Sequence, residues 1–179
     1  MMSQRQPVQS VELVIGIIFR DEGLLAELER ELKDLFGPIE LRSEIFDFDV
    51  TDYYRDEMGA DLRRIFYAFE NLISPDEIVE VKLKTDALER RFAHDGRRRV
   101  NIDPGYIDFY KLVLVSNKFL GQKIYLRKGV YADPTLYYDK GWKPYGWGFP
   151  DFKSGRYNNF LESVRSSYKA KLRGRSKIS

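Results

Sequence analysis

The sequence contains no cysteine and a single histidine, His94. Disulfide bridges and thiolate metal sites are therefore excluded, as is a metal site built from several histidines of one chain. No apolar run approaches the ~20 residues that a membrane-spanning helix requires. Residues 1–10 carry no hydrophobic signal core, so we expect a cytoplasmic protein that does not bind membranes.

Three familiar motifs are also missing. They are the Gly-x-x-x-x-Gly-Lys-Ser/Thr phosphate loop, the Gly-x-Gly-x-x-Gly dinucleotide fingerprint and the Gly-x-Ser-x-Gly nucleophile elbow. Asn117-Lys118 resembles the start of the guanine-reading tetrapeptide of GTPases, but Leu120 stands where the base-binding aspartate is required. The sequence therefore lacks the usual signatures of these enzyme classes, and no residue pattern identifies a reaction.

The composition predicts one domain over residues 1–179. Apolar residues make up 43% of the chain and charged residues 32%, which suits a globular fold with a full core. The net charge of +2 is uneven, because the last eleven residues hold five cations and no acid: Lys169, Lys171, Arg173, Arg175 and Lys177. This tail is interpreted either as a solvated helix end or as an RNA contact.

The first hundred residues alternate between strand and helix patterns. The predicted order is strand, helix, strand, strand, helix, strand, over Val11–Phe19, 25–35, 39–49, 62–73, 74–92 and 100–103. The second helix has a capping box, Ser74 to Glu77. Residues 79–85 also alternate as a strand would, with a further cap at 86–89, so that alternative stays open. The order β-α-β-β-α-β predicts a ferredoxin-like core.

The remaining chain predicts a C-terminal antiparallel meander and a closing helix. Strand patterns cover 112–115, 124–126, 130–132 and 136–138, with turns at Lys128-Gly129 and Lys140-Gly141. A packed aromatic loop follows at 142–150. The closing helix presents Tyr157, Leu161, Val164, Tyr168 and Leu172 on one face. The fold class expected is α+β.

The densest polar segment is 97–106, where three arginines precede Val-Asn-Ile-Asp-Pro-Gly-Tyr. Alternation places Asn101 and Asp103 on one strand face, and Pro104-Gly105 predicts a turn that ends the strand. We interpret this face either as a binding site or as turn chemistry. Arg99 is the best placed of the five arginines at 90–99 to meet phosphate oxygens. Tyr106 and Lys111 follow the expected turn.

Carboxylates and phenols gather in the segment before the third strand. Asp47 and Asp49 share a strand face, and Asp52 follows in a loop. Oxygen ligands at this spacing could hold Mg²⁺, and Asp49, Asp52 and Asp103 are the candidate metal ligands. The alternative is a solvated strand face. Tyr53 and Tyr54 are interpreted as a ligand wall or as a loop with one ring in the core.

These residues resemble a bacterial and archaeal family known only as a domain of unknown function (4416). The resemblance is carried by Thr51-Asp52-Tyr53-Tyr54, Met58-Gly59, Arg99 to Tyr106, Lys111, Lys118 and Ile124-Tyr125-Leu126. It covers nearly the whole chain, from Val14 to about Tyr168. The family has no settled activity, and the loose GTP-binding label of some members finds no support in this sequence. The chain departs from the pattern at Asp133-Pro134, where we expect strand continuity to be interrupted.

The leading hypothesis is a polar cleft that binds a phosphorylated small molecule, a nucleotide or an RNA end, with Mg²⁺ as the candidate cofactor. Asp52, Asn101 and Asp103 would orient or ligate, Arg99 and Lys111 would meet anionic oxygens, and three phenols would wall the cleft: Tyr53, Tyr54 and Tyr106. If the protein is an enzyme, phosphoryl or nucleotidyl transfer fits best. The alternatives are an RNA- or protein-interaction module with an aromatic meander (Tyr131, Tyr137, Tyr138 and Trp142), and a self-associating homo-oligomer.

Overall fold

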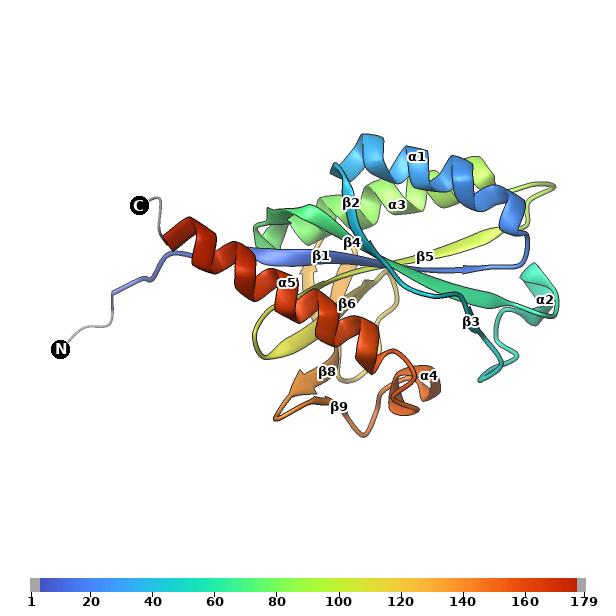
Figure 1. The fold of residues 1–179 in the computed structure, drawn as a ribbon. Coiled ribbons are helices and arrows are strands. Elements are labelled where there is room, and N and C mark those ends of the chain that lie inside the picture. The colour runs from blue at the N-terminus through green and yellow to red at the C-terminus, as the bar shows by residue number, and fades with distance from the viewer. Residues whose placement is uncertain (1–3, 177–179) are drawn as a thin grey trace.

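A computed structural model describes residues 4–176, with side chains described through Gly174. Lys177 and the side chain of Arg175, two cations of the basic tail that was interpreted as a solvated helix end or an RNA contact, lie outside this part. Within it, 3-10 turns at Glu22–Leu24 and Pro75–Glu77 lead into α1 and α3. The elements labelled in Figure 1 are, in chain order, β1 (Val11–Phe19), α1 (Leu25–Phe36), β2 (Ile39–Arg42), β3 (Phe46–Asp47), α2 (Arg55–Met58), β4 (Arg63–Ile73), α3 (Ile78–Phe92), β5 (Val100–Ile107), β6 (Lys111–Ser116), β7 (Ile124–Arg127), β8 (Val130–Tyr138), β9 (Trp142–Pro144), α4 (Pro150–Lys153) and α5 (Asn158–Ser176).

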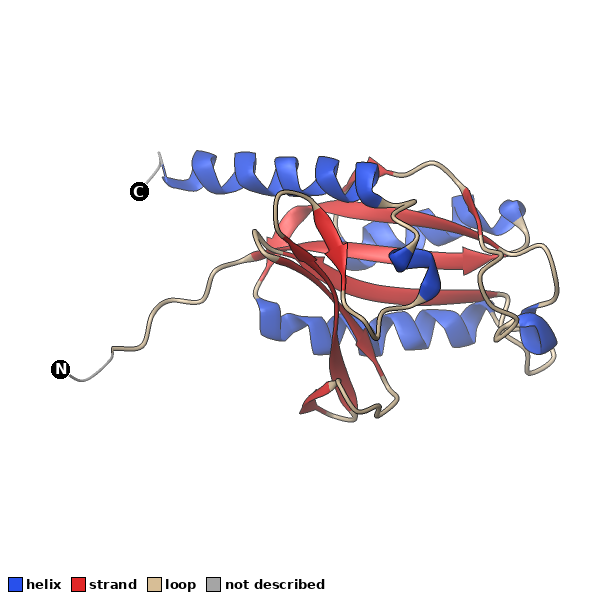
Figure 2. Ribbon diagram, turned by 90° about the horizontal axis from the view of Figure 1, so that it is seen from below, coloured by secondary structure: helices blue, strands red, loops and turns tan. Residues whose placement is uncertain are grey.

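The strands of the described residues join one antiparallel sheet. The main path runs β2-β4-β1-β5-β6-β8-β7, while β3 pairs with β4 and β9 with β8. β1 is central, because it pairs with β4 on one side and with β5 on the other. The half of the sheet that contains β8 turns away from the direction of the long central strands (Figure 2). A large antiparallel sheet with helices confirms the predicted mixture of helix and strand.

The helices cover the two faces of the sheet in two layers. α1 and α3 lie on one face and α5 lies on the other (Figure 1). Ile15 and Ile17 of β1 pack beneath the first layer with Leu28 of α1, whereas Phe66 and Leu161 belong to the core beneath α5. β1 is buried at every position because both layers cover it, as its apolar run predicted.

The capping box predicted at Ser74 and Glu77 stands at the start of the turn that leads into α3. The Ser74 backbone N–H donates to Glu77 Oε2 at 2.6 Å within a complete capping box, which satisfies N–H groups that lack a partner at a helix start. α3 then continues to Phe92. The alternative strand at 79–85 and the second cap at 86–89 are therefore wrong, because the alternating residues occupy consecutive helical turns.

The predicted strand at 39–49 divides in two. β2 and β3 both pair with β4, but residues 43–45 between them leave the ladder. Ser43 causes the break, because its Oγ accepts the Phe66 N–H at 2.9 Å while its own N–H donates to the Phe66 carbonyl. A side-chain oxygen thus replaces a backbone acceptor. The loop that was predicted to contain Asp52 likewise includes a short helix, α2.

The predicted turn at Pro104-Gly105 is wrong. Both residues lie inside β5, paired with Ile15 and Val14 of β1. β6 pairs with β5 only from Gly105 onward, so Pro104 has no strand neighbour on that side, which is where a strand tolerates proline. A Cβ on Gly105 would lie 2.7 Å from Leu114 Cδ2 and would collide with the Val113 carbonyl oxygen. The close approach of β6 requires this glycine.

The interruption expected at Asp133-Pro134 is also wrong, because β8 continues through both residues. The register against β6 shifts there, with Val113 opposite Pro134 and Leu112 opposite Leu136. Thr135 is the extra residue of this bulge, and its Oγ1 donates to the Asp133 carbonyl at 2.9 Å. Bulges are places where sheets accept proline. The two Lys-Gly turns of the meander form as predicted, with positive φ at both residues of each.

α5 is tied to the N-terminal end of β1 by polar contacts. Lys171 Nζ lies 2.8 Å from Glu12 Oε1 and 2.6 Å from Glu40 Oε2. Glu12 is fully buried, and burial raises its pKa to about 7 despite the lysine. The Tyr168 hydroxyl donates to the Ser10 carbonyl at 2.8 Å. No helix within residues 4–176 is both long and apolar enough to cross a bilayer.

Candidate functional site

A buried arginine, Arg64 of β4, is the centre of the polar groups beneath the sheet. The residue is 3% exposed. Its Nη2 donates to Asp103 Oδ2 at 2.8 Å and its Nη1 to Asp151 Oδ2 at 2.6 Å. The Tyr157 hydroxyl donates to the same Asp151 oxygen at 3.0 Å. Burial alone would lower the pKa of Arg64, but the two carboxylates hold it above its ordinary value.

Gly16 makes the contact between Arg64 and Asp103 possible. The two residues belong to strands that flank β1, where Gly16 faces Asp103 on one side and Phe66 on the other. A Cβ on Gly16 would lie 2.7 Å from Phe66 Cε1 and 3.1 Å from Arg64 Nη2. The guanidinium therefore crosses β1 over a position with no side chain.

The hydrogen-bond network continues from Asp103 toward α2. Asn101 Nδ2 donates to Asp103 Oδ1 at 2.8 Å, and Arg98 Nη1 donates to Asn101 Oδ1 at 2.8 Å. Arg98 also holds Glu57 of α2 with two bonds, from Nε at 2.8 Å and from Nη2 at 2.6 Å. These bonds lower the pKa of Glu57. Both oxygens of Asp103 are thus engaged, and the network joins α2, β5, β4 and α4.

The two tyrosines of the loop before α2 lie against this network. The Tyr54 ring packs on Phe48 at 5.9 Å, and the Arg98 guanidinium lies 5.7 Å from its centroid. Burial, with the nearby Asp103 carboxylate, raises the pKa of Tyr54. Tyr53 packs edge-on against Tyr54 at 4.9 Å, and its hydroxyl contacts Lys118 Nζ. One ring is therefore mostly buried and the other is exposed.

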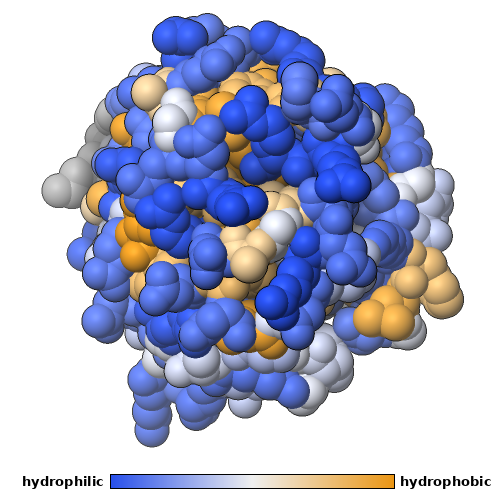
Figure 3. Space-filling view, turned by 90° about the vertical axis from the view of Figure 1, so that its right-hand side faces the viewer, coloured by the Kyte–Doolittle hydropathy of each residue, from blue (hydrophilic) through white to orange (hydrophobic). Residues whose placement is uncertain are grey.

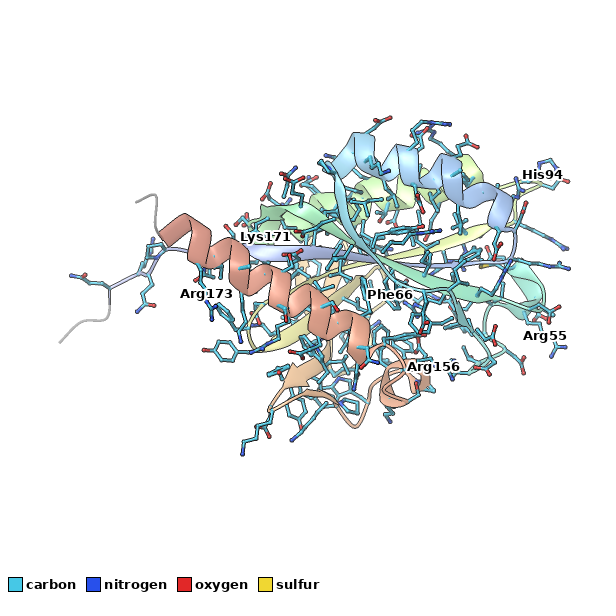
Figure 4. All side chains as sticks on the ribbon, viewed as in Figure 1. Arg55, Phe66, His94, Arg156, Lys171 and Arg173 are labelled. Atoms are coloured by element: carbon cyan, nitrogen blue, oxygen red, sulfur yellow. The ribbon has the colours of Figure 1, made fainter. Side chains whose placement is uncertain are left out.

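A hollow of about 660 Å³ opens beside the same loop. The residues that line it are Arg20, Asp47, Phe48, Asp49, Thr51, Asp52, Arg55, Gly59, Ala60, Asp61, Leu62 and Arg63. It lies at the α2 end of the molecule, whose surface is mainly hydrophilic around a small apolar area (Figure 3). Arg55 marks this end in Figure 4, far from Lys171 and Arg173 at the other end.

The three arginines of the hollow differ in what they contact. Arg63 contacts Glu22 and donates to the Arg20 carbonyl at 3.0 Å. Arg55 lies 3.3 Å from Asp52, and both side chains are largely exposed. The Arg20 guanidinium has no hydrogen-bond or ion-pair partner within residues 4–176. The hollow therefore presents one uncommitted guanidinium and one weakly held guanidinium.

A family model described as "Domain of unknown function (DUF4416)" matches residues 9–168. The chain belongs to this family. No curated protein and no solved structure matches the chain. Membership of the family carries no activity with it, so the function has to be argued from the geometry.

The site residues predicted from the sequence divide into three groups. Asn101, Asp103 and Tyr54 come together in the network, with Tyr53 beside them and Asp52 at the hollow. Arg99 points elsewhere and pairs with Asp21 at 3.1 Å.

Tyr106 and Lys111 lie at the other end of β5. Tyr106 packs against the core beneath α1 and α3, on the face opposite to Asp103, and Lys111 contacts Asp108.

The predicted metal trio is not one group in the structure. Asp49 lies 3.0 Å from Arg156, which lowers its pKa, while Asp52 pairs with Arg55 and Asp103 with Arg64. Within residues 4–176, no three carboxylate or histidine side chains gather as metal ligands would. Alternation relates residues of a single strand only, whereas Asp49, Asp52 and Asp103 come from three separate segments, and each pairs with an arginine of its own.

Sequence reasoning missed the residues that connect the network. Arg64, Arg98, Glu57, Asp151 and Tyr157 carry most of its hydrogen bonds. A signal was present in Arg64, an arginine followed by the apolar run Ile-Phe-Tyr-Ala-Phe, because an arginine buried in a strand requires charged partners.

Proposed function

We propose that the protein binds a phosphate-bearing ligand, a nucleotide or the end of an RNA, in the hollow beside α2. The observation that carries the proposal is the Arg20 guanidinium, which lines the hollow without a partner in the described chain. Arg55 supplies a second guanidinium, because its exposed contact with Asp52 costs little to exchange. Two arginine forks match the oxygens of one phosphate group.

The carboxylates around the hollow favour binding of a divalent cation together with the ligand. Asp52 and Asp61 line it together with Asp47 and Asp49. Mg²⁺ typically uses one or two protein carboxylates and completes its shell with water and substrate phosphate oxygens. A nucleotide could therefore bring its Mg²⁺ with it. If turnover follows binding, metal-assisted phosphoryl or nucleotidyl transfer is the reaction class that this chemistry supports.

The network at Asp103 supports the same proposal indirectly. Arg98 fixes Glu57 of α2 with two bonds, and Tyr54 packs on Phe48, which lines the hollow. Asn101 and Asp103 would act as positioning residues, which hold the loop that forms one wall. A preformed wall lowers the cost of ordering the site when the ligand binds.

A thermal-shift screen tests the proposal. Nucleotides and phosphorylated metabolites are added with and without Mg²⁺, and a ligand that binds the native state must raise the melting temperature. At a ligand concentration of about 100 Kd the expected stabilisation is roughly 2.7 kcal/mol. If no compound shifts the melting temperature in either condition, the proposal fails.

Three variants localise the binding. Arg20→Ala and Arg55→Ala should each weaken a genuine shift, because each removes a guanidinium from the hollow. Arg97→Ala is the matched control. Arg97 is exposed and has no side-chain partner within residues 4–176, but it does not line the hollow. Equal loss in all three variants would indicate a general charge effect and would contradict the assignment.

We also infer that β1, α1, β2, β4, α3 and β5 form a ferredoxin-like core. The order β2-β4-β1-β5 with antiparallel neighbours supports this inference, since a split β-α-β arrangement has the same strand order. The fold alone carries no function.

A further inference from the structure

A row of aromatic side chains leads away from the hollow across the far half of the sheet. Tyr125 and Tyr131 are paired directly across β7 and β8, and their rings lie 5.2 Å apart. Phe119 packs against Tyr131 at 5.9 Å. The neighbour of Phe119, Lys118, lies over the Tyr53 ring at 4.7 Å. We call Tyr53, Lys118, Phe119, Tyr131 and Tyr125 the aromatic track.

Three of the four rings of the aromatic track are exposed, and Tyr131 is partly buried between Phe119 and Tyr125. Tyr53 is 60% exposed, Phe119 is 72% exposed and Tyr125 is 58% exposed. Leaving such large apolar surfaces in water forgoes the stabilisation that burial provides, and contiguous exposed apolar surface commonly marks an interaction site. Tyr53 follows Asp52, which lines the hollow, so the track begins at the rim of the proposed phosphate site.

The segment that carries Lys118, Phe119, Tyr125 and Tyr131 of the track is rich in cations. Residues 117–131 contain four cations, Lys118, Lys123, Arg127 and Lys128, and no acid. Lys123 forms an ion pair with the buried Asp133, and Arg127 and Lys128 both pair with Glu80. Lys118 contacts the ring and hydroxyl of Tyr53 and forms no ion pair among the described residues, although its charge helps to lower the pKa of Glu57.

We propose that the aromatic track binds the bases of a single-stranded nucleic acid whose terminal phosphate occupies the hollow. Successive bases stack on exposed rings, and cations beside the rings follow the backbone. An acidic peptide would complement the cations, but it would not require several aromatic rings on one surface. The inference rests on the proposed function and names the class of its ligand.

Fluorescence anisotropy with a labelled oligouridylate of about 12 nucleotides, a length that several rings can engage, tests the inference. Phe119→Ala and Tyr125→Ala should each weaken binding by about tenfold, since one stacked base contributes on the order of that factor. Lys118→Ala should flatten the salt dependence by about 0.7 in d log K/d log[salt].

Tyr110→Ala is the control. Tyr110 is 71% exposed but lies outside the track, before β6, and its substitution should leave binding unchanged. Because the substituted rings are exposed, the folds should persist, and circular dichroism checks this. Wild-type affinity in both ring variants overturns the inference, as does equal weakening in Tyr110→Ala. Binding of an acidic peptide in place of the oligonucleotide also overturns it.

The mononucleotide thermal shift separates the two proposals. A nucleotide shift that depends on Arg20, together with ring-independent oligonucleotide binding, overturns the track and leaves the proposed function standing. The opposite result is oligonucleotide binding that depends on the rings but is unchanged in Arg20→Ala. It would show that the hollow is not the phosphate site and would overturn the placement of the terminal phosphate.

Discussion

Arg64 and Asp103 form an ion pair across an intervening strand, with 2.8 Å between Nη2 and Oδ2. The pair exists because Gly16 stands between them on β1. The glycine in the apolar run of β1 and the arginine at the start of β4 are therefore linked. Gly16 leaves the space through which the Arg64 guanidinium reaches Asp103. The network built on this pair determines how α2 and α4 are held to the sheet.

Substitution of Gly16 should destabilise the protein. In Gly16→Ala the new Cβ would lie 2.7 Å from the Phe66 ring and 3.1 Å from Arg64 Nη2, and overpacking of this kind costs about 1–3 kcal/mol. Urea unfolding measures the loss. Gly174→Ala is the control, because no atom of the described residues outside its chain neighbours and its own helix backbone lies within 4 Å of the added methyl, and alanine favours helix. Equal stability of Gly16→Ala and wild type would contradict the close packing of Phe66 and Arg64 over Gly16.

Arg64 and its neighbour Arg63 should differ sharply when each is changed to methionine. Arg64→Met leaves two carboxylates beneath the sheet without their counterion, which costs about 3–5 kcal/mol. Arg63 contacts Glu22 where both side chains are accessible to water, so Arg63→Met should cost less than about 1 kcal/mol. Chemical denaturation compares the two, and similar losses would argue against a buried network.

Stability should fall as pH rises through neutrality because of Glu12. Burial raises its pKa from 4.5 to about 7, so the folded protein holds this proton more tightly than the unfolded chain does. The stabilising contribution is complete below pH 4.5 and is lost as pH rises through 7. The raised pKa of Glu12 corresponds to about 3 kcal/mol in the free energy of unfolding. Glu12→Gln should flatten the fall in unfolding free energy between pH 5 and 8, and a wild-type curve that is already flat would refute this.

Loss of Arg98 should loosen the segment at 51–59. Arg98→Ala removes both bonds to Glu57 and the bond to Asn101, and a partly exposed ion pair of this kind contributes about 1 kcal/mol. Amide hydrogen exchange in that segment should accelerate about fivefold, as such a loss of local opening energy implies. Arg97→Ala should leave exchange there as in wild type. An unchanged rate in Arg98→Ala would mean that other contacts hold the loop.

The sequence predicted the elements whose causes are local. The capping box at Ser74 and the Lys-Gly turns act within a few residues, and each formed as expected. The uniformly apolar run of β1 likewise required a covered strand. Pro104-Gly105 misled because the same dipeptide suits a turn or a close strand contact, and only the position of β6 decides between them.

The candidate site was harder to predict because its contacts join distant segments. Asp103 and Arg64 are 39 positions apart and Arg64 and Asp151 are 87 apart. Alternation correctly placed Asn101 and Asp103 on one face, but it could not show that β4 lies on the far side of β1. The choice of Arg99 instead of Arg98 has the same origin, since Glu57 draws Arg98 inward.

The contacts of α5 with β1 join two segments near the ends of the described chain, because the Tyr168 hydroxyl donates to the Ser10 carbonyl and Lys171 pairs with Glu12. Both ends leave the molecule on one side (Figure 1). A short peptide joining them would permit circular permutation, with new termini opened at the Lys128-Gly129 hairpin. Such a molecule would keep every network contact, and its thermal unfolding would show whether chain order matters to this architecture.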